Sequence, residues 1–181
     1  MQQHEQEPEP HQHPQQHIAG WMWFGFWFLL LGLMAMFFNS WLEKERNPNQ
    51  EVATSIHDGG LREVTLKRNR YGHYNVTGEI NGHKVEFLLD TGATNISVPA
   101  GVADQIGLQR LYEVEFSTAN GIAKGYGTKI DTVRVGNITL RDLNASINPN
   151  VDDEIILLGM AFLKRIEFTQ RGDLLILRQY P

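Results

Sequence analysis

The segment VEFLLDTGATNISVP, residues 85–99, contains the carboxylate best placed for chemistry in this chain. An apolar stretch leads directly into Asp90, Thr91 and Gly92, and a second apolar stretch follows them. Glycine allows a tight turn beside a ligand or a second backbone, and the threonine hydroxyl can hydrogen-bond across a close interface. Ordinary β-turns favour the same residue types. Because apolar stretches flank the tripeptide on both sides, we interpret Asp90 as a candidate for acid–base chemistry.

Other kinds of reactive centre find little support in the sequence. The chain has 181 residues and no cysteine, which excludes disulfides, thiol nucleophiles and cysteine-ligated metals. The histidines at 57, 73 and 83 lack the spacing of metal ligands, so no metal site is predicted. Asp131, Asp142 and the acidic run 152–154 lack the setting of Asp90 and are interpreted as solvated charges. The net charge of −5 argues against nucleic acid as a partner.

Residues 61–181 must position Asp90, and their pattern predicts a mainly β domain. Asparagine and glycine tolerate the positive φ angles of tight hairpin turns. Three such turns are predicted, at Asn81-Gly82, Asn120-Gly121 and Gly136-Asn137. Short helices are expected over 100–108 and 160–164, and strands over 155–158 and 173–177. The strands are too short and too closely spaced for alternating strand–helix units.

The chain before this domain divides into three parts. Residues 1–17 are rich in Gln, His and Pro, cannot build a core, and are expected to be a disordered tail. Residues 18–42 form an apolar run without charge, long enough for a transmembrane helix through a hydrocarbon core of about 30 Å. The run lacks the basic start and the small-residue cleavage site of a signal peptide. The polar residues 43–60 are interpreted as a linker.

Residues 87–94, FLLDTGAT, resemble the active-site loop of pepsin-type aspartic proteases in their retroviral, single-domain form. Leu157, Leu158 and Gly159 are similar to the second signature of that family, in the strand beneath the catalytic loop. The segment STANG, residues 117–121, takes the place of the flap hairpin. The best match is to the membrane-anchored bacterial branch. The resemblance implies a closed, single-domain retropepsin-like β fold with one or two short helices.

The resemblance also implies how Asp90 would act. Aspartic proteases use two carboxylates that share one proton: one activates a water, and the other donates to the peptide carbonyl oxygen. The chain has one Asp-Thr-Gly. A homodimer is therefore implied, with one Asp90 from each chain and with Thr91 hydrogen-bonded across the two-fold axis. Thr91, Gly92 and Ala93 would support the loop, although many family members have serine where Ala93 stands. No cofactor or metal is expected.

Ala119, Asn120 and Gly121 are expected at the tip of a flap that closes over an extended peptide. The C-terminal strand, residues 174–177, is expected to join the dimer sheet, with residues 61–70 as its candidate partner. The predicted function is that of a membrane-anchored homodimeric aspartic endopeptidase with protein or peptide substrates. The alternative is a non-catalytic peptide-binding or dimerisation module on the same fold.

Two features bear on the location of the domain. The resemblance implies a single-pass protein of the bacterial inner membrane with its protease domain in the periplasm. Lys44 and Arg46 follow the span, and basic residues favour the cytoplasmic side. Glu43 and Glu45 surround these two bases, and the expectation therefore follows the resemblance.

Overall fold

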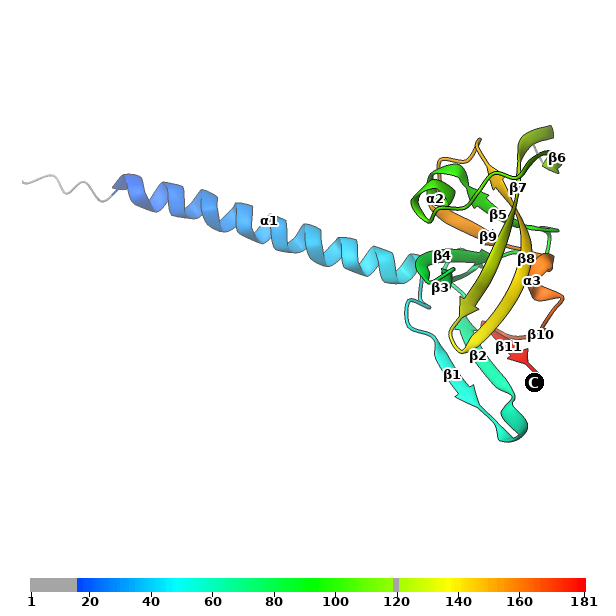
Figure 1. Ribbon diagram of the computed structural model, residues 1–181. Helices are drawn as coiled ribbons and strands as arrows, with labels where there is room; N and C mark the ends of the chain where they lie inside the picture. The colour runs from blue at the N-terminus through cyan, green and yellow to red at the C-terminus, as the bar shows by residue number, and fades with distance from the viewer. Residues whose placement is uncertain (1–15, 119–120) are drawn as a thin grey trace, which may run out of the picture. The chain divides into compact units, whose positions relative to one another are not determined.

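The computed structural model describes residues 16–118 and 121–181, and the chain divides into two units between residues 42 and 43 (Figure 1). The first unit contains the helix α1 (Gln16–Arg46), whose last turn belongs to the second unit. The segment Trp21–Arg46 is long and apolar enough to cross a membrane. The expected N-terminal apolar helix is thus confirmed, whereas residues 1–15 of the predicted tail lie outside the described residues.

Residues 43–181 fold into two β-sheets (Figure 1). The larger has the strand order β3-β4-β9-β5-β8-β7-β6, and it closes on itself because β3 also pairs with β7. The smaller has the order β1-β2-β11-β10. The strands are β1 (Ala53–Ile56), β2 (Arg62–Lys67), β3 (Tyr74–Ile80), β4 (His83–Leu89), β5 (Ile96–Pro99), β6 (Tyr112–Thr118), β7 (Gly121–Val135), β8 (Ile138–Asn148), β9 (Ile155–Leu158), β10 (Glu167–Arg171) and β11 (Leu174–Gln179). The short helices are η1 (Asp58–Gly60), α2 (Ala100–Gln105) and α3 (Met160–Leu163).

The core forms where the apolar sides of paired strands meet. In the β3–β4 hairpin, Val76 lies opposite Phe87, and both side chains are fully buried. Successive strand residues point to opposite faces, so a period of two in the sequence places one set of side chains inside. The largest fully buried side chains come from both sheets and from α3: Phe87, Phe162, Leu66, Ile80, Ile96, Ile130, Ile138, Ile147, Ile156, Leu158, Leu163 and Leu177. The predicted mainly β fold is confirmed.

Two of the predicted turns have the positive φ angles that their asparagine and glycine residues tolerate. Asn81 and Gly82 have φ angles of 51° and 84° and connect β3 to β4 with Ile80 opposite His83. Positive φ at both positions is the geometry of the tightest β-hairpin turn. Gly136, with φ 58°, begins the predicted turn between β7 and β8. The helix expected over 100–108 ends earlier, at Gln105, and Gly107 with φ 71° follows it.

The linker expected over residues 43–60 differs from what is observed, because the structure builds much of this segment into the second unit. Residues 53–56 form β1, which pairs with β2 and extends the smaller sheet. Asn47 and Asn49 are each only 4% exposed. The polar composition of the segment reflects buried hydrogen bonds instead of solvation, which composition alone does not distinguish.

A network of asparagine side chains fastens this segment to the domain. The Asn49 side-chain nitrogen donates to the carbonyl oxygens of Lys67 at 2.8 Å and Asn75 at 2.6 Å, and its oxygen accepts the Lys67 amide at 2.6 Å. Asn47 donates to the Thr77 hydroxyl at 3.1 Å. The Thr77 amide in turn donates to the Asn49 carbonyl at 3.2 Å. Asn49 thereby bridges the ends of β2 and β3, much as an additional strand residue would.

We expect Asn49→Ala to lower the free energy of unfolding of the domain by about 2–4 kcal/mol, because the change leaves several buried backbone groups without partners. Chemical denaturation monitored by circular dichroism measures this loss. Asn144→Ala is the matched control, since Asn144 is exposed on β8 and its loss is expected to cost less than about 0.5 kcal/mol. Equal stabilities for the two variants would contradict the structural role of Asn49.

The C-terminal strand corrects a second expectation. The structure pairs β11 with β2 on one edge and with β10 on the other, all within one chain. Residues 62–67 are therefore the partner of the C-terminal strand, but within the same chain. The edges of the smaller sheet are β1 and β10. A partner chain that added a strand to this sheet would have to do so at one of those edges.

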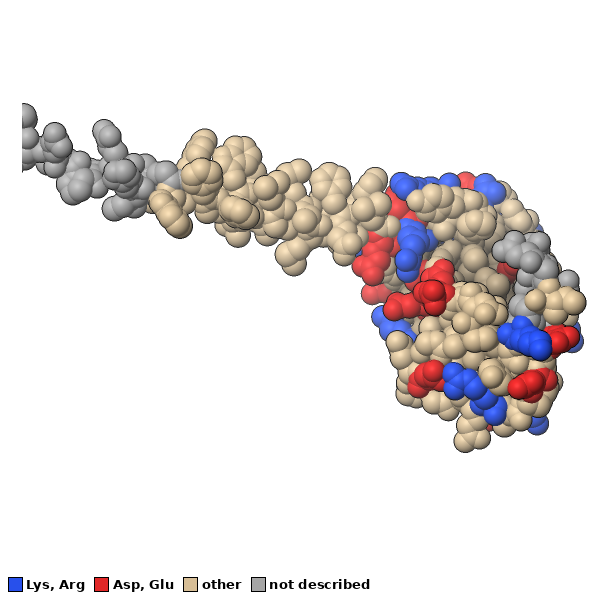
Figure 2. Space-filling view, turned by 90° about the horizontal axis from the view of Figure 1, so that it is seen from above, with Lys and Arg blue, Asp and Glu red and all other residues tan. Residues whose placement is uncertain are grey.

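Charged side chains of both signs alternate over the face of the second unit seen in Figure 2. The second unit also contains ion pairs, among them Arg178 with Glu63 at 2.8 Å and with Glu167 at 3.2 Å. The hydrogen bond from Arg178 holds the pKa of Glu63 below its ordinary value. Ion pairs at the protein surface contribute about 0–1 kcal/mol each. The mixed surface therefore favours no strongly charged partner on this face.

Candidate active site

Asp90 directly follows β4, which lies between β3 and β9 in the larger sheet. β4 and β9 run parallel, with Leu88 opposite Leu157 and Leu89 opposite Leu158. The Asp90 amide donates to the Leu158 carbonyl oxygen at 3.2 Å. The ladder thus continues one residue past the strand, and it fixes the backbone that carries the carboxylate.

The turn after β4 is closed by the carboxylate itself. The Gly92 amide donates to Asp90 Oδ1 at 2.8 Å, and the Ala93 amide donates to the Asp90 carbonyl oxygen at 3.2 Å. A Cβ atom at position 92 would lie 3.1 Å from Asp90 Oδ1. Because glycine lacks this atom, Gly92 leaves the carboxylate room to lie against the turn. A carboxylate held by a backbone amide is oriented before any substrate arrives.

Gly159 packs directly against the Asp90 loop. A Cβ atom at position 159 would lie 2.4 Å from the carbonyl oxygens of both Ala93 and Asn95. The next two amides donate into the same loop, from Met160 to the Ala93 oxygen at 2.8 Å and from Ala161 to the Thr94 oxygen at 3.0 Å. The chain between β9 and α3 therefore supports the loop from below, and this support requires a residue without a side chain.

The structure brings together two of the three groups of residues singled out in the sequence. The loop of Asp90, Thr91, Gly92 and Ala93 lies against the strand end at Leu157, Leu158 and Gly159 through strand pairing and backbone hydrogen bonds. These segments are more than sixty residues apart in the chain.

The far side of the loop faces outward. Thr91 and Gly92 are exposed, and Asp90 is half-buried. A carboxylate oriented by its own turn and reachable from solvent can meet a water, a substrate or a second copy of the same loop. The chain thus presents one oriented carboxylate in this loop, with backbone support on one side and the exposed residues Thr91 and Gly92 on the other.

The third group, the expected flap, is described only in part. Gly121 begins β7, which pairs with β6 through an antiparallel ladder from Tyr112 opposite Gly127 to Thr118 opposite Gly121. Ala119 and Asn120 lie outside the described residues. The two strands thus pair as neighbours along the chain, whereas the turn predicted at Asn120-Gly121 lies partly outside the described residues. A hollow of about 430 Å³ lies along these two strands and is lined by Glu113, Val114, Glu115, Lys124, Gly125, Tyr126 and Pro149.

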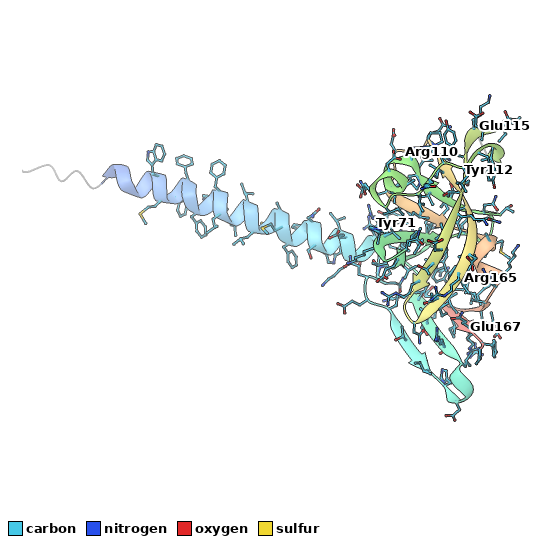
Figure 3. All side chains as sticks on the ribbon, viewed as in Figure 1. Tyr71, Arg110, Tyr112, Glu115, Arg165 and Glu167 are labelled. Atoms are coloured by element: carbon cyan, nitrogen blue, oxygen red, sulfur yellow. The ribbon has the colours of Figure 1, made fainter. Side chains whose placement is uncertain are left out.

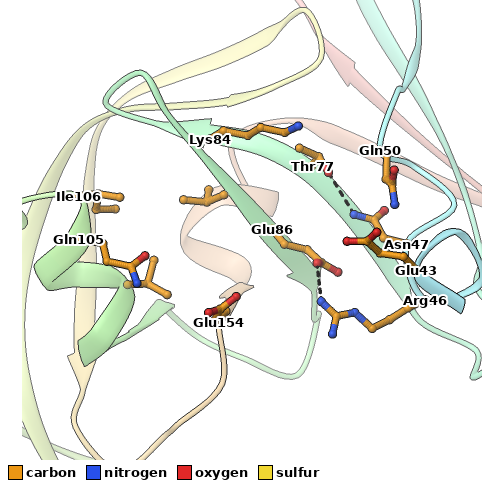
Figure 4. A pocket seen from close by; sticks show the side chains of 12 residues that line it. Glu43, Arg46, Asn47, Gln50, Thr77, Lys84, Glu86, Gln105, Ile106 and Glu154 are labelled. Atoms are coloured by element: carbon orange, nitrogen blue, oxygen red, sulfur yellow. Dashed lines mark hydrogen bonds and ion pairs between the residues drawn. The ribbon is translucent and has the colours of Figure 1, made fainter. Parts of the chain in front are cut away.

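A second hollow, of about 290 Å³, involves residues that the sequence analysis did not single out (Figure 4). It lies between residues 43–50, the β3–β4 hairpin and α2. Arg46 donates a hydrogen bond to Glu86 at 2.9 Å across the wall of this hollow. Glu86 also accepts a hydrogen bond from Asn75 at 2.9 Å. The only sequence signal for this arrangement is the pair of asparagines around Pro48, within a segment interpreted as a linker.

The family model described as "gag-polyprotein putative aspartyl protease" matches residues 76–165 of the chain. This interval begins within β3, includes the Asp90 loop and the β6–β7 hairpin, and ends just after α3. It thus contains both of the segments that the structure joins around Asp90.

A solved structure, the retropepsin-like aspartic protease from Rickettsia conorii, is similar to the chain with a TM-score of 0.56 and 29% sequence identity, covering 72% of this chain and 96% of that one. An uncharacterized protein of Sinorhizobium is 36% identical over 131 residues, which are 70% of this chain and 56% of that protein. An uncharacterized protein of Rickettsia prowazekii is 32% identical over 120 residues, or 64% of this chain and 51% of that protein. The chain spans about half the length of these two curated relatives.

Proposed function

Because the chain belongs to the retropepsin-like family of aspartic proteases, we propose that it is an endopeptidase whose active site uses two Asp90 carboxylates, one from each chain of a homodimer. The observation that carries this proposal is the Asp90 loop. Its backbone is held by Leu158 and Gly159, while Thr91 and Gly92 are exposed on its outer side. A loop whose inner side is held by backbone contacts and whose outer side is exposed suits apposition with an identical loop about a two-fold axis.

The chemistry follows from two carboxylates placed side by side. Like charges about 3 Å apart do not both ionise readily, so the pair holds one proton between them. The ionised carboxylate removes a proton from a bound water as the water oxygen attacks the carbonyl carbon of the substrate. The protonated carboxylate donates to the carbonyl oxygen. Proton transfer to the leaving nitrogen then accompanies cleavage of the carbon–nitrogen bond.

The neighbouring residues have supporting roles in this proposal. Thr91 of each chain hydrogen-bonds across the two-fold axis and holds the two loops in register. Gly92 and Ala93 keep the turn tight, and Leu157, Leu158 and Gly159 hold it from below. The β6–β7 hairpin, with Ala119, Asn120 and Gly121 near its tip, closes over an extended peptide whose backbone pairs with the hairpin.

The N-terminal helix supports a membrane location for this activity. The helix segment Trp21–Arg46 is long and apolar enough to cross a bilayer once. We propose that its uncharged part, up to Leu42, anchors the protein in the bacterial inner membrane with residues 43–181 on the periplasmic side. Anchoring confines the domains to one surface and raises their effective concentration, which favours a dimer. The proposed substrates are proteins or peptides, and the proposed reaction needs no cofactor.

Subunit mixing tests whether each active site takes Asp90 from two chains. The full-length wild-type chain and the Asp90→Asn variant are co-expressed in equal amounts, and hydrolysis of a mixed peptide pool is followed by mass spectrometry. If both carboxylates are required and pairing is random, activity falls to about a quarter of that of the same total amount of wild-type chain. Independent catalytic monomers would retain about half.

The mixing experiment has its control in the same chain. Asp131 is exposed and remote in sequence from the loop, so co-expression with Asp131→Asn is expected to leave the activity unchanged. Inhibition by a statine-type transition-state analogue would further separate an aspartic protease from a peptide-binding module, since the analogue blocks only a catalytic site of this class.

A further inference from the structure

The loop between β2 and β3, residues 68–73, carries an exposed aromatic–cation pair. Tyr71 is 60% exposed, and the Arg70 guanidinium lies 4.7 Å from the centre of its ring. Tyr71 is labelled in Figure 3. Single exposed aromatic residues are common on protein surfaces, so this pair alone indicates nothing. What distinguishes it is the part of the chain to which its loop is fastened.

Asn69 fixes this loop to the residues that follow the apolar helix. Its side-chain nitrogen donates to the Arg46 carbonyl oxygen at 2.9 Å, and its side-chain oxygen accepts the amides of Tyr71 at 2.9 Å and His73 at 3.0 Å. Asn69 is only 8% exposed. The position of Tyr71 relative to Arg46 is therefore set by part-buried hydrogen bonds within the second unit.

Arg70 also lies close to this part of the chain. Its hydrogen bond to the Tyr71 hydroxyl raises the pKa of Arg70, and the negative charge of Glu45 contributes in the same direction. Glu45 and Arg46 are the third and fourth residues after Leu42, the last residue of the apolar run. The amide of Asn47 still donates to the Glu43 oxygen at 2.9 Å, so the helical hydrogen bonding continues through these residues.

The length of this connection limits how far Arg46 can lie from the end of the apolar run. Four helical residues advance by about 6 Å at most along the bilayer normal. The headgroup layer on each side of a bilayer is about 5–8 Å thick. If the apolar run ends where the hydrocarbon ends, Arg46 lies within the headgroup layer, and Asn69, near the start of the loop, lies within hydrogen-bond distance of Arg46. Tyrosine and arginine are suited to that layer, since each combines an apolar body with a polar end.

We infer that Arg70 and Tyr71 form a second membrane contact of each protomer, in addition to the spanning helix, and that they lie among the lipid headgroups. The inference rests on the proposed membrane anchoring. A single helix leaves the attached domain free to tilt, whereas a second contact point restricts how residues 43–181 lie against the bilayer surface. The access of substrate to the Asp90 loop would then depend on a fixed orientation of the domain.

The test uses the absence of cysteine in the chain. Tyr71→Cys in the full-length protein provides the single attachment point for a small fluorophore. The labelled protein is placed in phosphatidylcholine vesicles with or without a nitroxide on the lipid headgroup. Tyr180→Cys is the matched control, because Tyr180 is 59% exposed and follows Gln179, which pairs with Arg62 at the other end of β2. Headgroup nitroxide is expected to reduce the fluorescence at position 71 about twofold more than at position 180.

A third label distinguishes failure of the second contact from failure of the proposed membrane anchoring. Leu31→Cys lies in the middle of the apolar run and reports on a nitroxide in the acyl chains. If position 31 is quenched while positions 71 and 180 respond equally to the headgroup nitroxide, the anchoring stands and the second contact is refuted. If position 31 is not quenched, both the proposed membrane anchoring and the inferred second contact are refuted. Fluorophore self-quenching at position 71 without lipid quenching would instead assign the loop to a contact between two chains, which also refutes the inference. Arg70→Cys provides a second reporter that keeps the tyrosine.

Discussion

Replacing Asp90 with asparagine is expected to lower kcat/KM for peptide hydrolysis by at least about 10³-fold, since general acid–base catalysis by such a group contributes on that scale. An amide cannot take a proton from the attacking water, nor can it give one to the carbonyl oxygen. In a homodimer, the change removes both carboxylates at once. A mixed peptide pool analysed by mass spectrometry measures the loss whatever sequence the enzyme cleaves.

The same variant is expected to fold normally. The side-chain oxygen of asparagine can still accept the Gly92 amide, which lies 2.8 Å from Asp90 Oδ1. The side chain is half-buried and gains no charge, so the midpoint of thermal unfolding should hardly move. Asp131→Asn, on the exposed side of β7, should leave both activity and stability unchanged. Substantial cleavage by the Asp90→Asn dimer would remove Asp90 from the mechanism.

Gly159→Ala is expected to damage both stability and activity, although position 159 carries no reactive group. The added Cβ would meet the Ala93 and Asn95 carbonyl oxygens at 2.4 Å, and both are backbone atoms of the Asp90 loop and the residues that follow it. Overpacking of this kind costs about 1–3 kcal/mol of folding free energy. Because the loop must shift to make room, kcat/KM is expected to fall by about 10²-fold, the loss that a displacement of about 1 Å can cause.

The control for Gly159→Ala is a glycine with open space around it. A Cβ at Gly101, in α2, would meet nothing within 4 Å. Gly101→Ala should therefore preserve activity and could only raise stability, by up to about 1 kcal/mol, since alanine is the better helix former. Denaturation curves and peptide cleavage assays compare the stability and the activity of the two variants. If Gly159→Ala behaves like Gly101→Ala, the loop does not depend on the strand end beneath it.

The Asp90→Asn and Gly159→Ala variants test different levels of the same site. Asp90→Asn tests whether the Asp90 carboxylate transfers protons. Gly159→Ala tests whether the backbone contact at Gly159 positions that carboxylate. If Asp90→Asn abolishes cleavage while Gly159→Ala leaves it intact, the proposed mechanism stands and the proposed support is lost. The reverse result would leave a structurally important turn with no demonstrated chemistry.

Local patterns in the sequence sufficed for features that depend on a few neighbouring residues. Asn81-Gly82 predicts a tight hairpin because both residues tolerate the positive φ angles found there. Alternation predicts which residues of β3 and β4 face inward, as Val76 and Phe87 show. The resemblance around Asp90 and Gly159 likewise rests on short segments with restrictive backbone needs.

Polar residues near the N-terminal side of the domain were harder to interpret. Asn47 and Asn49 lie in a segment whose composition is typical of a linker, yet both are buried and hydrogen-bonded to β2 and β3. An asparagine side chain can be solvated or can replace a backbone partner, and its neighbours in sequence do not determine which. That choice depends on strands that lie up to thirty residues further along the chain.

The apolar helix, the mainly β character of residues 61–181, the tight turns at Asn81-Gly82 and Gly136-Asn137 and the candidate carboxylate were all predictable from the amino-acid sequence, because each follows from side-chain periodicity or from backbone preferences over a few residues. The three-dimensional fold was needed to show that β9 lies parallel to β4, that Gly159 touches the Asp90 loop, that β11 pairs within its own chain, and that residues 43–56 belong to the domain. These features require segments distant in sequence to find one register among many, and that register is set by the packing and hydrogen bonding of the whole sheet.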